Sequence, residues 1–131
     1  MILVDTSVWI EVFRARSPLD LESVVPFDEV ATCLPVIQEV LQGFRDERSF
    51  QVARRALSAL PIVESPLNAL LFEEAAQLYR RARRAGFTVQ SSVDCLIAAC
   101  AIRNGIGVLH KDRDFTALAR VSELDQRPLP R

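Results

Sequence analysis

The sequence of 131 residues contains few of the residues on which several common kinds of site depend. Histidine occurs once, at position 110, and no serine or cysteine has an evident base partner, so a catalytic triad is not supported. The four glycines form no glycine-rich phosphate-binding loop. The three cysteines are odd in number and have no Cys-x-x-Cys spacing, which argues against a disulfide framework or a zinc site. We expect all three to be reduced residues of the core.

Long apolar segments and an excess of one charge are also missing. The longest apolar runs are far shorter than the ~18 residues of a membrane span, and the N-terminus lacks the basic region of a signal peptide. We therefore expect a soluble, cytoplasmic protein. With 16 basic and 17 acidic residues the net charge is −1, so the chain as a whole does not resemble a polyanion-binding protein. A composition that is 50% hydrophobic supports one core, and we predict a single domain over residues 1–131.

The first thirteen residues predict a strand, a turn and a helix. Ile2–Val4 is apolar and is followed by an acid and two hydroxyl residues, a pattern typical of a buried parallel strand that ends at a polar edge. Thr6 or Ser7 can cap a following helix, whose apolar residues are spaced over positions 8–13. In open α/β sheets ligands bind beyond the carboxyl ends of the strands, so Asp5 is a candidate for chemistry. The alternative is that Asp5 only caps the helix.

Strand and helix patterns alternate along the rest of the chain, which predicts an α/β fold with a mostly parallel sheet. The longest helix is expected to begin with Ser65 as N-cap and Pro66 at its first position, and to end before Gly86. Pro18 is expected to end the first helix. Further strands are predicted at 30–34, 62–63, 106–109 and 127–129, and helices at 19–25, 35–44, 47–60, 66–85, 95–102 and around 118.

Four acidic residues are expected to meet at one edge of this sheet. Right-handed crossovers bring the carboxyl ends of all strands to one side, so Asp5, Asp94 and Asp112 should converge there. Glu39, one turn into a helix, can reach the same crevice, although its position beside the apolar stripe also suits an ordinary solvated glutamate. Carboxylates gathered without matching lysines require raised pKa values or a bound cation. Oxygen ligands favour Mg²⁺ or Mn²⁺.

Each of these acids lies in a short segment with a recognisable pattern. The segments are Ile-Leu-Val-Asp5-Thr-Ser-Val-Trp, Pro-Val-Ile-Gln-Glu39-Val-Leu-Gln-Gly, Ser-Val-Asp94-Cys-Leu-Ile-Ala-Ala and His-Lys-Asp112-Arg-Asp-Phe. They resemble the four acidic motifs of PIN-domain nucleases, and their order and spacing over essentially the whole chain are similar to those of VapC toxins. The resemblance implies that these four acids form the catalytic site, that Asp5 and Asp94 bind the metal directly, and that Asp114 is an accessory acid.

The resemblance also implies a fold, an activity and partners. The fold would be a PIN-like three-layer sandwich, with a mostly parallel central sheet of four to five strands flanked by helices. The activity would be that of a Mg²⁺-dependent endoribonuclease toxin of a type II toxin–antitoxin system, with Mn²⁺ as a substitute, cleaving structured RNA such as tRNA or rRNA by metal-activated water attack on a phosphodiester. A cognate VapB-like antitoxin would bind near helices 36–44 and 50–60, and the chain would form a homodimer.

The segment around the fourth acid carries basic residues and one departure from the family pattern. Lys111 and Arg113 alternate with two aspartates, so in an extended loop their side chains would point away from the acids, towards an RNA backbone. Alternatively, they only balance the local charge, and RNA passes the arginines at 80–84 of the long helix. This chain has His110 where many members of the family have Thr or Ser, so the resemblance does not define how substrate or water is positioned at this residue.

Three other function classes fit less well. A haloacid-dehalogenase-type phosphatase needs a second aspartate two residues after the first, where this chain has Ser7. A response-regulator receiver needs paired acids near the first strand and a lysine near the end of the sheet. A catalytically inactive PIN-like module that binds RNA or protein remains the alternative to an enzyme. A Mg²⁺-dependent cleavage assay distinguishes these two readings.

Overall fold

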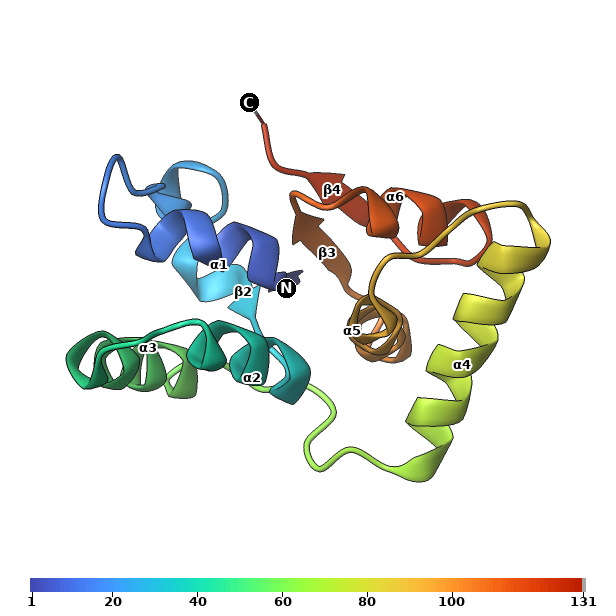
Figure 1. The fold of residues 1–131 in the computed structure, drawn as a ribbon, viewed down its shortest axis with the longest axis horizontal. Helices are drawn as coiled ribbons and strands as arrows, with labels where there is room; N and C mark the ends of the chain where they lie inside the picture. The colour runs from blue at the N-terminus through green and yellow to red at the C-terminus, as the bar shows by residue number, and fades with distance from the viewer. Residues whose placement is uncertain (131) are drawn as a thin grey trace.

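In the computed structural model, which describes residues 1–130, four strands form one parallel sheet (Figure 1). The order across the sheet is β2-β1-β3-β4, with β1 at Ile2–Val4, β2 at Val30–Ala31, β3 at Gly107–His110 and β4 at Gln126–Pro128. The residues of the central strand β1 are all buried, as expected where helices cover both faces of a parallel sheet. The predicted fold class, an α/β sandwich around a mostly parallel sheet of four to five strands flanked by helices, is confirmed.

Within residues 1–130, six α-helices accompany the sheet, and Figure 1 shows α1 to α3 on the side of β2 and α4 to α6 on the side of β3 and β4. Because all strands run in the same direction, their carboxyl ends meet at one edge, and α1 and α6 begin just beyond β1 and β3. The helices are α1 (Thr6–Phe13), α2 (Leu34–Gln42), α3 (Glu47–Ser58), α4 (Ala69–Arg84), α5 (Ser92–Arg103) and α6 (Arg113–Arg120).

The core is built around α5, which packs against α4. Ile97 and Ala98–Ala101 are buried, and the small alanine side chains allow neighbouring elements to approach α5 closely. Cys33, Cys95 and Cys100 are free and buried, so the prediction that the cysteines are reduced core residues is confirmed. No helix within residues 1–130 is both long and apolar enough to cross a membrane.

The predicted start of the longest helix is wrong. α4 begins at Ala69, and its N-cap is Asn68, whose side chain accepts a hydrogen bond from the backbone N–H of Leu71 at 3.0 Å. Ser65 and Pro66 instead belong to the loop before the helix and are joined by a cis peptide bond. Asparagine at this position pairs one of the free amides of the first turn, so it starts the helix more effectively than a proline two residues earlier. The predicted end is confirmed: Gly86 follows with a φ of +88°.

Other predicted elements are shorter than expected. α1 ends at Phe13, well before Pro18, and the predicted helix at 19–25 is a three-residue 3₁₀ turn at Leu21–Ser23. The predicted strands at 30–34 and 62–63 reduce to β2 and a single bridge between Thr32 and Ile62. The reason for the short strand is that α2 begins at Leu34 with a proline in its first turn, so the chain leaves the sheet earlier.

Candidate metal centre

Four acidic side chains lie together at the carboxyl edge of β1 and β3, and we refer to Asp5, Glu39, Asp94 and Asp112 as the acidic edge. Ligand oxygens of Asp5, Glu39 and Asp94 all lie within 4.8 Å of one another. Oxygens of Asp94, Asp112 and Asp114 form a second group within the same limit. Because Asp94 belongs to both groups, it connects them into one cluster. The structure therefore brings together all five acids that the sequence singles out.

Asp5 occupies the turn between β1 and α1. It is the N-cap of α1, and its Oδ2 accepts hydrogen bonds from the backbone N–H of Ser7 at 3.0 Å and from the Ser7 hydroxyl at 2.6 Å. The prediction that Thr6 or Ser7 caps this helix is therefore wrong. Capping uses only one carboxylate oxygen, since Oδ1 is buried and has no hydrogen-bond partner within residues 1–130. The two alternatives considered for Asp5, a cap or a chemical group, are thus compatible.

Glu39 reaches the acidic edge from α2. It is half-buried, and its Oε1 accepts a hydrogen bond from the Thr6 hydroxyl at 2.9 Å. Burial raises the pKa of Glu39, the Thr6 hydrogen bond opposes this, and the charges of Asp5 and Asp112 raise the pKa further. The contact joins residues 33 positions apart, so helical periodicity could not reveal it. Glu39 is therefore not an ordinary solvated glutamate.

Asp94 is the most strongly perturbed acid of the cluster. It lies in the first turn of α5 and is only 4% exposed, and its Oδ2 is buried without a hydrogen-bond partner in the described part of the chain. Burial raises the pKa of Asp94 to about 10, with added contributions from the hydrogen bond to Asp114 and the charge of Asp5. Burial likewise raises the pKa of Asp5. Without a cation, Asp94 is therefore protonated at neutral pH.

Asp112 and Asp114 fix the turn between β3 and α6. Asp112 is the N-cap of α6, and its Oδ1 accepts a hydrogen bond from the backbone N–H of Asp114 at 2.9 Å. The buried Asp114 carboxylate accepts backbone hydrogen bonds from Gln90 and Ser91, each at 3.0 Å. Gln90 and Ser91 precede α5, which carries Asp94. Asp114 therefore holds the start of α5 against α6, which gives the accessory acid a structural role.

The donor set of the acidic edge fits a divalent cation. A buried carboxylate oxygen without a partner is costly, and Asp5 Oδ1 and Asp94 Oδ2 are two such atoms in one cluster. None of the ion pairs found within residues 1–130 involves an acid of this edge. A cation with oxygen ligands would remove both the repulsion between the acids and the unpaired oxygens. The acidic edge can therefore hold a divalent metal ion.

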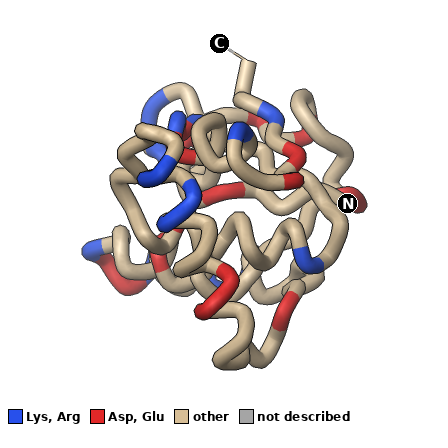
Figure 2. Tube along the Cα trace, turned by 90° about the vertical axis from the view of Figure 1, so that its right-hand side faces the viewer, with Lys and Arg blue, Asp and Glu red and all other residues tan. Residues whose placement is uncertain are grey.

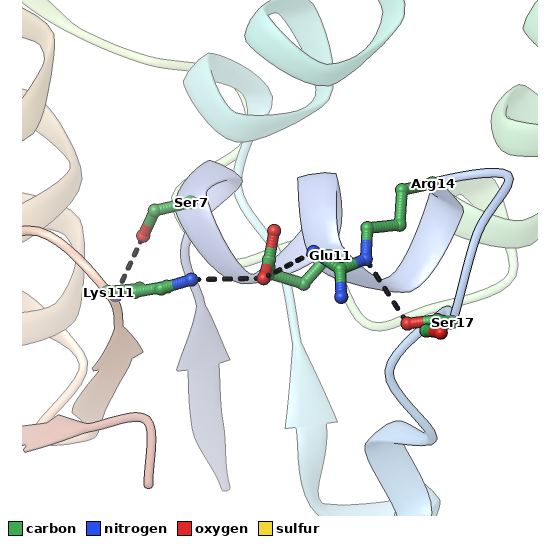
Figure 3. A network of polar contacts seen from close by, with 5 residues as sticks. All are labelled: Ser7, Glu11, Arg14, Ser17 and Lys111. Carbon is green, nitrogen blue, oxygen red and sulfur yellow. Dashed lines mark hydrogen bonds and ion pairs between the residues drawn. The ribbon is translucent and has the colours of Figure 1, made fainter. Parts of the chain in front are cut away.

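Lys111, which precedes the fourth acid, forms an ion pair with a residue of α1. Lys111 Nζ lies 3.0 Å from Glu11 Oε1, which also pairs with Arg14 at 3.2 Å, and Arg14 Nε donates to the backbone oxygen of Ser17 (Figure 3). The hydrogen bond from Lys111 lowers the pKa of Glu11. The backbone N–H of Lys111 donates to the Ser7 hydroxyl at 2.8 Å. We call these five residues the polar network; it meets the acidic edge at Ser7.

Arg113 is not in an extended loop. It is the first residue of α6, so the expectation that Lys111 and Arg113 alternate with the acids along an extended segment is wrong. Arg113 lines a groove of about 390 Å³ that also includes Asp114, Arg120 and the half-buried Phe87. Figure 2, which views the molecule from the side of α4 to α6, shows several basic positions close together in the upper left of this face. Arg113 and Arg120 therefore extend from a helix, α6, and not from an extended loop.

Sequence reasoning found the acids but missed the hydroxyl residues that hold them. Thr6 binds Glu39, and Ser7 binds both Asp5 and the turn that leads to Asp112. The signal was present, because both hydroxyls directly follow Asp5, but the same pattern is typical of a helix cap. Only the arrangement of β1, α2 and β3 in space distinguishes the two interpretations.

Comparisons with known proteins agree with this arrangement. The PIN domain family matches residues 2–121 of the chain. The ribonuclease VapC11 of Mycobacterium tuberculosis is 41% identical over 129 residues, which cover 95% of this chain and 96% of that protein. VapBC2 of Rickettsia felis, solved with a DNA fragment from its promoter, has a similar fold, with a TM-score of 0.77, 17% identity and coverage of 99% and 100% of the two chains.

A second solved structure is also similar in fold. VapC20 of Mycobacterium tuberculosis, described as a toxin that cleaves the sarcin–ricin loop, has a TM-score of 0.72 and 24% identity, and the alignment covers 95% of this chain and 99% of that one. In both solved structures the likeness extends over nearly the whole of each chain. The acidic edge therefore lies in a fold that other proteins of the same size share.

Proposed function

The chain belongs to the PIN-domain family and, within it, to the VapC ribonucleases, and from this membership we propose that it is a Mg²⁺-dependent endoribonuclease toxin of a type II toxin–antitoxin system. The observation that carries the proposal is the acidic edge with its two buried, unpaired carboxylate oxygens. Asp5 and Asp94 supply these oxygens, and we assign both residues as direct metal ligands. Mn²⁺ offers the same preference for oxygen ligands and would substitute.

The residues around the metal have separate tasks in the proposed hydrolysis. A divalent cation held by Asp5 and Asp94 would polarise the phosphoryl oxygen, lower the pKa of the attacking water and offset charge on the leaving oxygen. Ser7 fixes the Asp5 carboxylate through Oδ2, which leaves Oδ1 free. Thr6 fixes Glu39, and the raised pKa of Glu39 suits a base that orients the water and takes its proton. Asp112 completes the negative cluster beside Asp94.

The substrate that this site suits is RNA, with structured tRNA or rRNA as the proposed class. Its phosphates require basic contacts that the acidic edge does not provide. Arg113 and Arg120 line the groove beside α6, and the Asp114 carboxylate in its lining accepts hydrogen bonds from the backbone N–H groups of Gln90 and Ser91. The Arg120 guanidinium lies over the Phe87 ring, 5.8 Å from its centre, and this contact holds one of the two arginine charges at the groove. Lys111 would contact a phosphate after releasing Glu11.

We further propose that a VapB-like antitoxin blocks the site from the side of α1 and α2. A groove of about 270 Å³ lies between these helices, lined by apolar residues that include Trp9, Phe13 and Phe44. Glu39 also belongs to the lining, so an apolar partner segment in the groove would bring a basic side chain to the acidic edge. The groove includes α2, as predicted, but its lining contains no residue of α3. The solved VapBC structures support a partner of this kind.

For the homodimer we propose the opposite side of the molecule. An apolar groove of about 490 Å³ lies between α4 and the start of α5. Phe72 in its lining is 52% exposed, and the neighbouring Leu70 is 51% exposed. Exposed apolar surface of this kind supports contact with a second copy. Sedimentation of the wild type and of Phe72→Glu tests this: the variant should be monomeric, and a variant that remains dimeric would place the interface elsewhere.

The experiment for the proposed function is a cleavage assay on total tRNA and rRNA. Wild-type protein with Mg²⁺ should produce discrete fragments, and addition of EDTA or the substitution Asp94→Asn should stop their formation. Sequencing the new 5′ ends after induced expression would identify the RNA and the bond. Co-expression with the product of the neighbouring gene should give a stable complex that no longer cleaves. Absence of cleavage by the wild type on all these RNAs would favour the inactive binding module.

A further inference from the structure

His110 is the last residue of β3 and lies two residues before Asp112. It is 2% exposed, and its ring packs against that of Phe115 with 5.2 Å between the ring centres. Both ring nitrogens have partners: Nδ1 accepts a hydrogen bond from the backbone N–H of Asp112 at 3.1 Å, and Nε2 lies 2.6 Å from Oε1 of Gln126 on β4. A buried imidazole needs a partner for each nitrogen, and here the partners are the turn that carries Asp112 and the edge strand β4.

These contacts determine which tautomer the ring adopts. A backbone N–H can only donate, so Nδ1 must present its lone pair to Asp112. The neutral imidazole then carries its proton on Nε2 and donates it to Oε1 of Gln126. Gln126 therefore selects the tautomer whose Nδ1 accepts the Asp112 amide. An edge strand of the sheet is in this way connected to the acidic edge.

The hydrogen bond from Asp112 to His110 is the first of a series. Asp112 in turn accepts the backbone N–H of Asp114 at 2.9 Å, and Asp114 accepts the backbone N–H groups of Gln90 and Ser91. Each link joins a side-chain acceptor to a backbone donor, and the series runs from the end of β3 to the segment before α5. The series therefore positions the Asp112 carboxylate relative to Asp94.

We propose that His110 is a positioning residue of the nuclease site, which fixes the turn that carries Asp112 and is itself oriented by Gln126. This inference rests on the proposed function as a metal-dependent nuclease. A Thr or Ser hydroxyl at position 110 could also accept the Asp112 amide but would be too short to contact Gln126 as well. The imidazole therefore adds a connection to β4. Loss of its acceptor nitrogen leaves the Asp112 amide unpaired and loosens the second group of acids.

The substitutions His110→Phe and His110→Asn separate this role from packing. Phenylalanine keeps a ring against Phe115 but has no acceptor. Asparagine leaves a cavity but offers an oxygen to the amide two residues later, as Asp112 does to Asp114. Phe115→Leu is the matched packing control, because it loosens the same contact while keeping the imidazole. For each variant we would measure the thermal midpoint, the Mn²⁺ affinity by calorimetry, and kcat and KM for RNA cleavage.

We expect the three variants to rank differently by thermal midpoint than by kcat and Mn²⁺ affinity. His110→Phe should lower kcat and Mn²⁺ affinity by roughly 10- to 100-fold, typical of residues that orient metal ligands, with KM unchanged because His110 does not contact RNA. His110→Asn should restore both values to within about threefold of the wild type despite a lower thermal midpoint, and Phe115→Leu should lower only the midpoint. Wild-type kcat and Mn²⁺ affinity in His110→Phe, or function that follows the thermal midpoint across the three variants, would overturn the proposal. A wild type that neither binds Mn²⁺ nor cleaves RNA would instead refute the proposed function.

Discussion

The acidic edge and the polar network lie side by side at the start of α1, yet their charges are balanced in opposite ways. In the network, Lys111 is 54% exposed and pairs with Glu11, which also pairs with Arg14. At the acidic edge, Asp5 and Asp94 are almost fully buried and have no basic partner within residues 1–130. Burial of charge without pairing is unfavourable unless a ligand compensates for it. The contrast identifies the edge, and not the network, as the place that a cation would stabilise.

The largest expected effect is on catalysis. Asp94→Asn should reduce RNA cleavage by roughly 1,000-fold or more, because it removes a direct ligand from the group that acts as a unit. Glu11→Gln, the matched change from acid to amide in the polar network, should leave cleavage within about threefold of the wild type, as expected for an exposed ion pair. Single-turnover rates at saturating Mg²⁺ measure both. Similar losses in the two variants would remove the distinction between the regions.

The second effect concerns stability and pH in the presence of a chelator. The folded-state pKa of Asp94, about 10, lies above its usual value, so the folded protein holds a proton that the unfolded chain releases. This stabilisation is complete below pH 4 and decreases as the pH rises towards 10. Asp94→Asn should therefore be more stable than the wild type by about 1–3 kcal/mol at pH 8, with little difference at pH 4. Urea unfolding of both proteins at the two pH values measures this; a stability difference between variant and wild type that does not grow from pH 4 to pH 8 would contradict it.

The third effect concerns how RNA binds beside an acidic site. In the inactive Asp5→Asn background, the double substitution Lys111→Ala and Arg113→Ala should reduce the slope of log affinity against log salt by about 1.4, as expected for two lost contacts to single-stranded phosphates. Arg54→Ala, on the exposed face of α3, is the control and should not change the slope. Filter binding between about 50 and 200 mM salt gives the values. An unchanged slope in the double variant would contradict these contacts and place the RNA path along the arginines of α4.

The smallest effect is expected within the polar network itself. Glu11→Gln should leave the midpoint of urea unfolding unchanged within error, because exposed pairs of this kind contribute little. It should raise RNA affinity a few-fold, because Lys111 no longer has an anionic partner and can contact a phosphate. Lys111→Ala in the same variant should cancel the gain. A large loss of stability would mean that the network is a structural element comparable to the core.

The sequence predicts much of this architecture because local signals determine it. Apolar runs mark β1 and β3, and Gly86 marks the end of α4. The acids could be predicted as a group because parallel topology brings strand ends to one edge. Contacts between distant residues could not be predicted: the Thr6–Glu39 bond spans 33 positions and the Lys111–Glu11 pair spans 100. Such pairs depend on the tertiary arrangement. For the same reason, the spacing of apolar residues in α2 could not predict that Glu39 is half-buried.

The most direct test of the account is calorimetric titration of Mg²⁺ or Mn²⁺ into metal-free protein at constant pH. Wild type should bind the cation and release protons, because Asp94 is protonated before binding. Asp5→Asn and Asp94→Asn should each weaken the affinity by at least about tenfold, whereas Glu11→Gln should not. Equal affinity in the wild type and in both acidic-edge variants would contradict the central claim that Asp5 and Asp94 form a metal site.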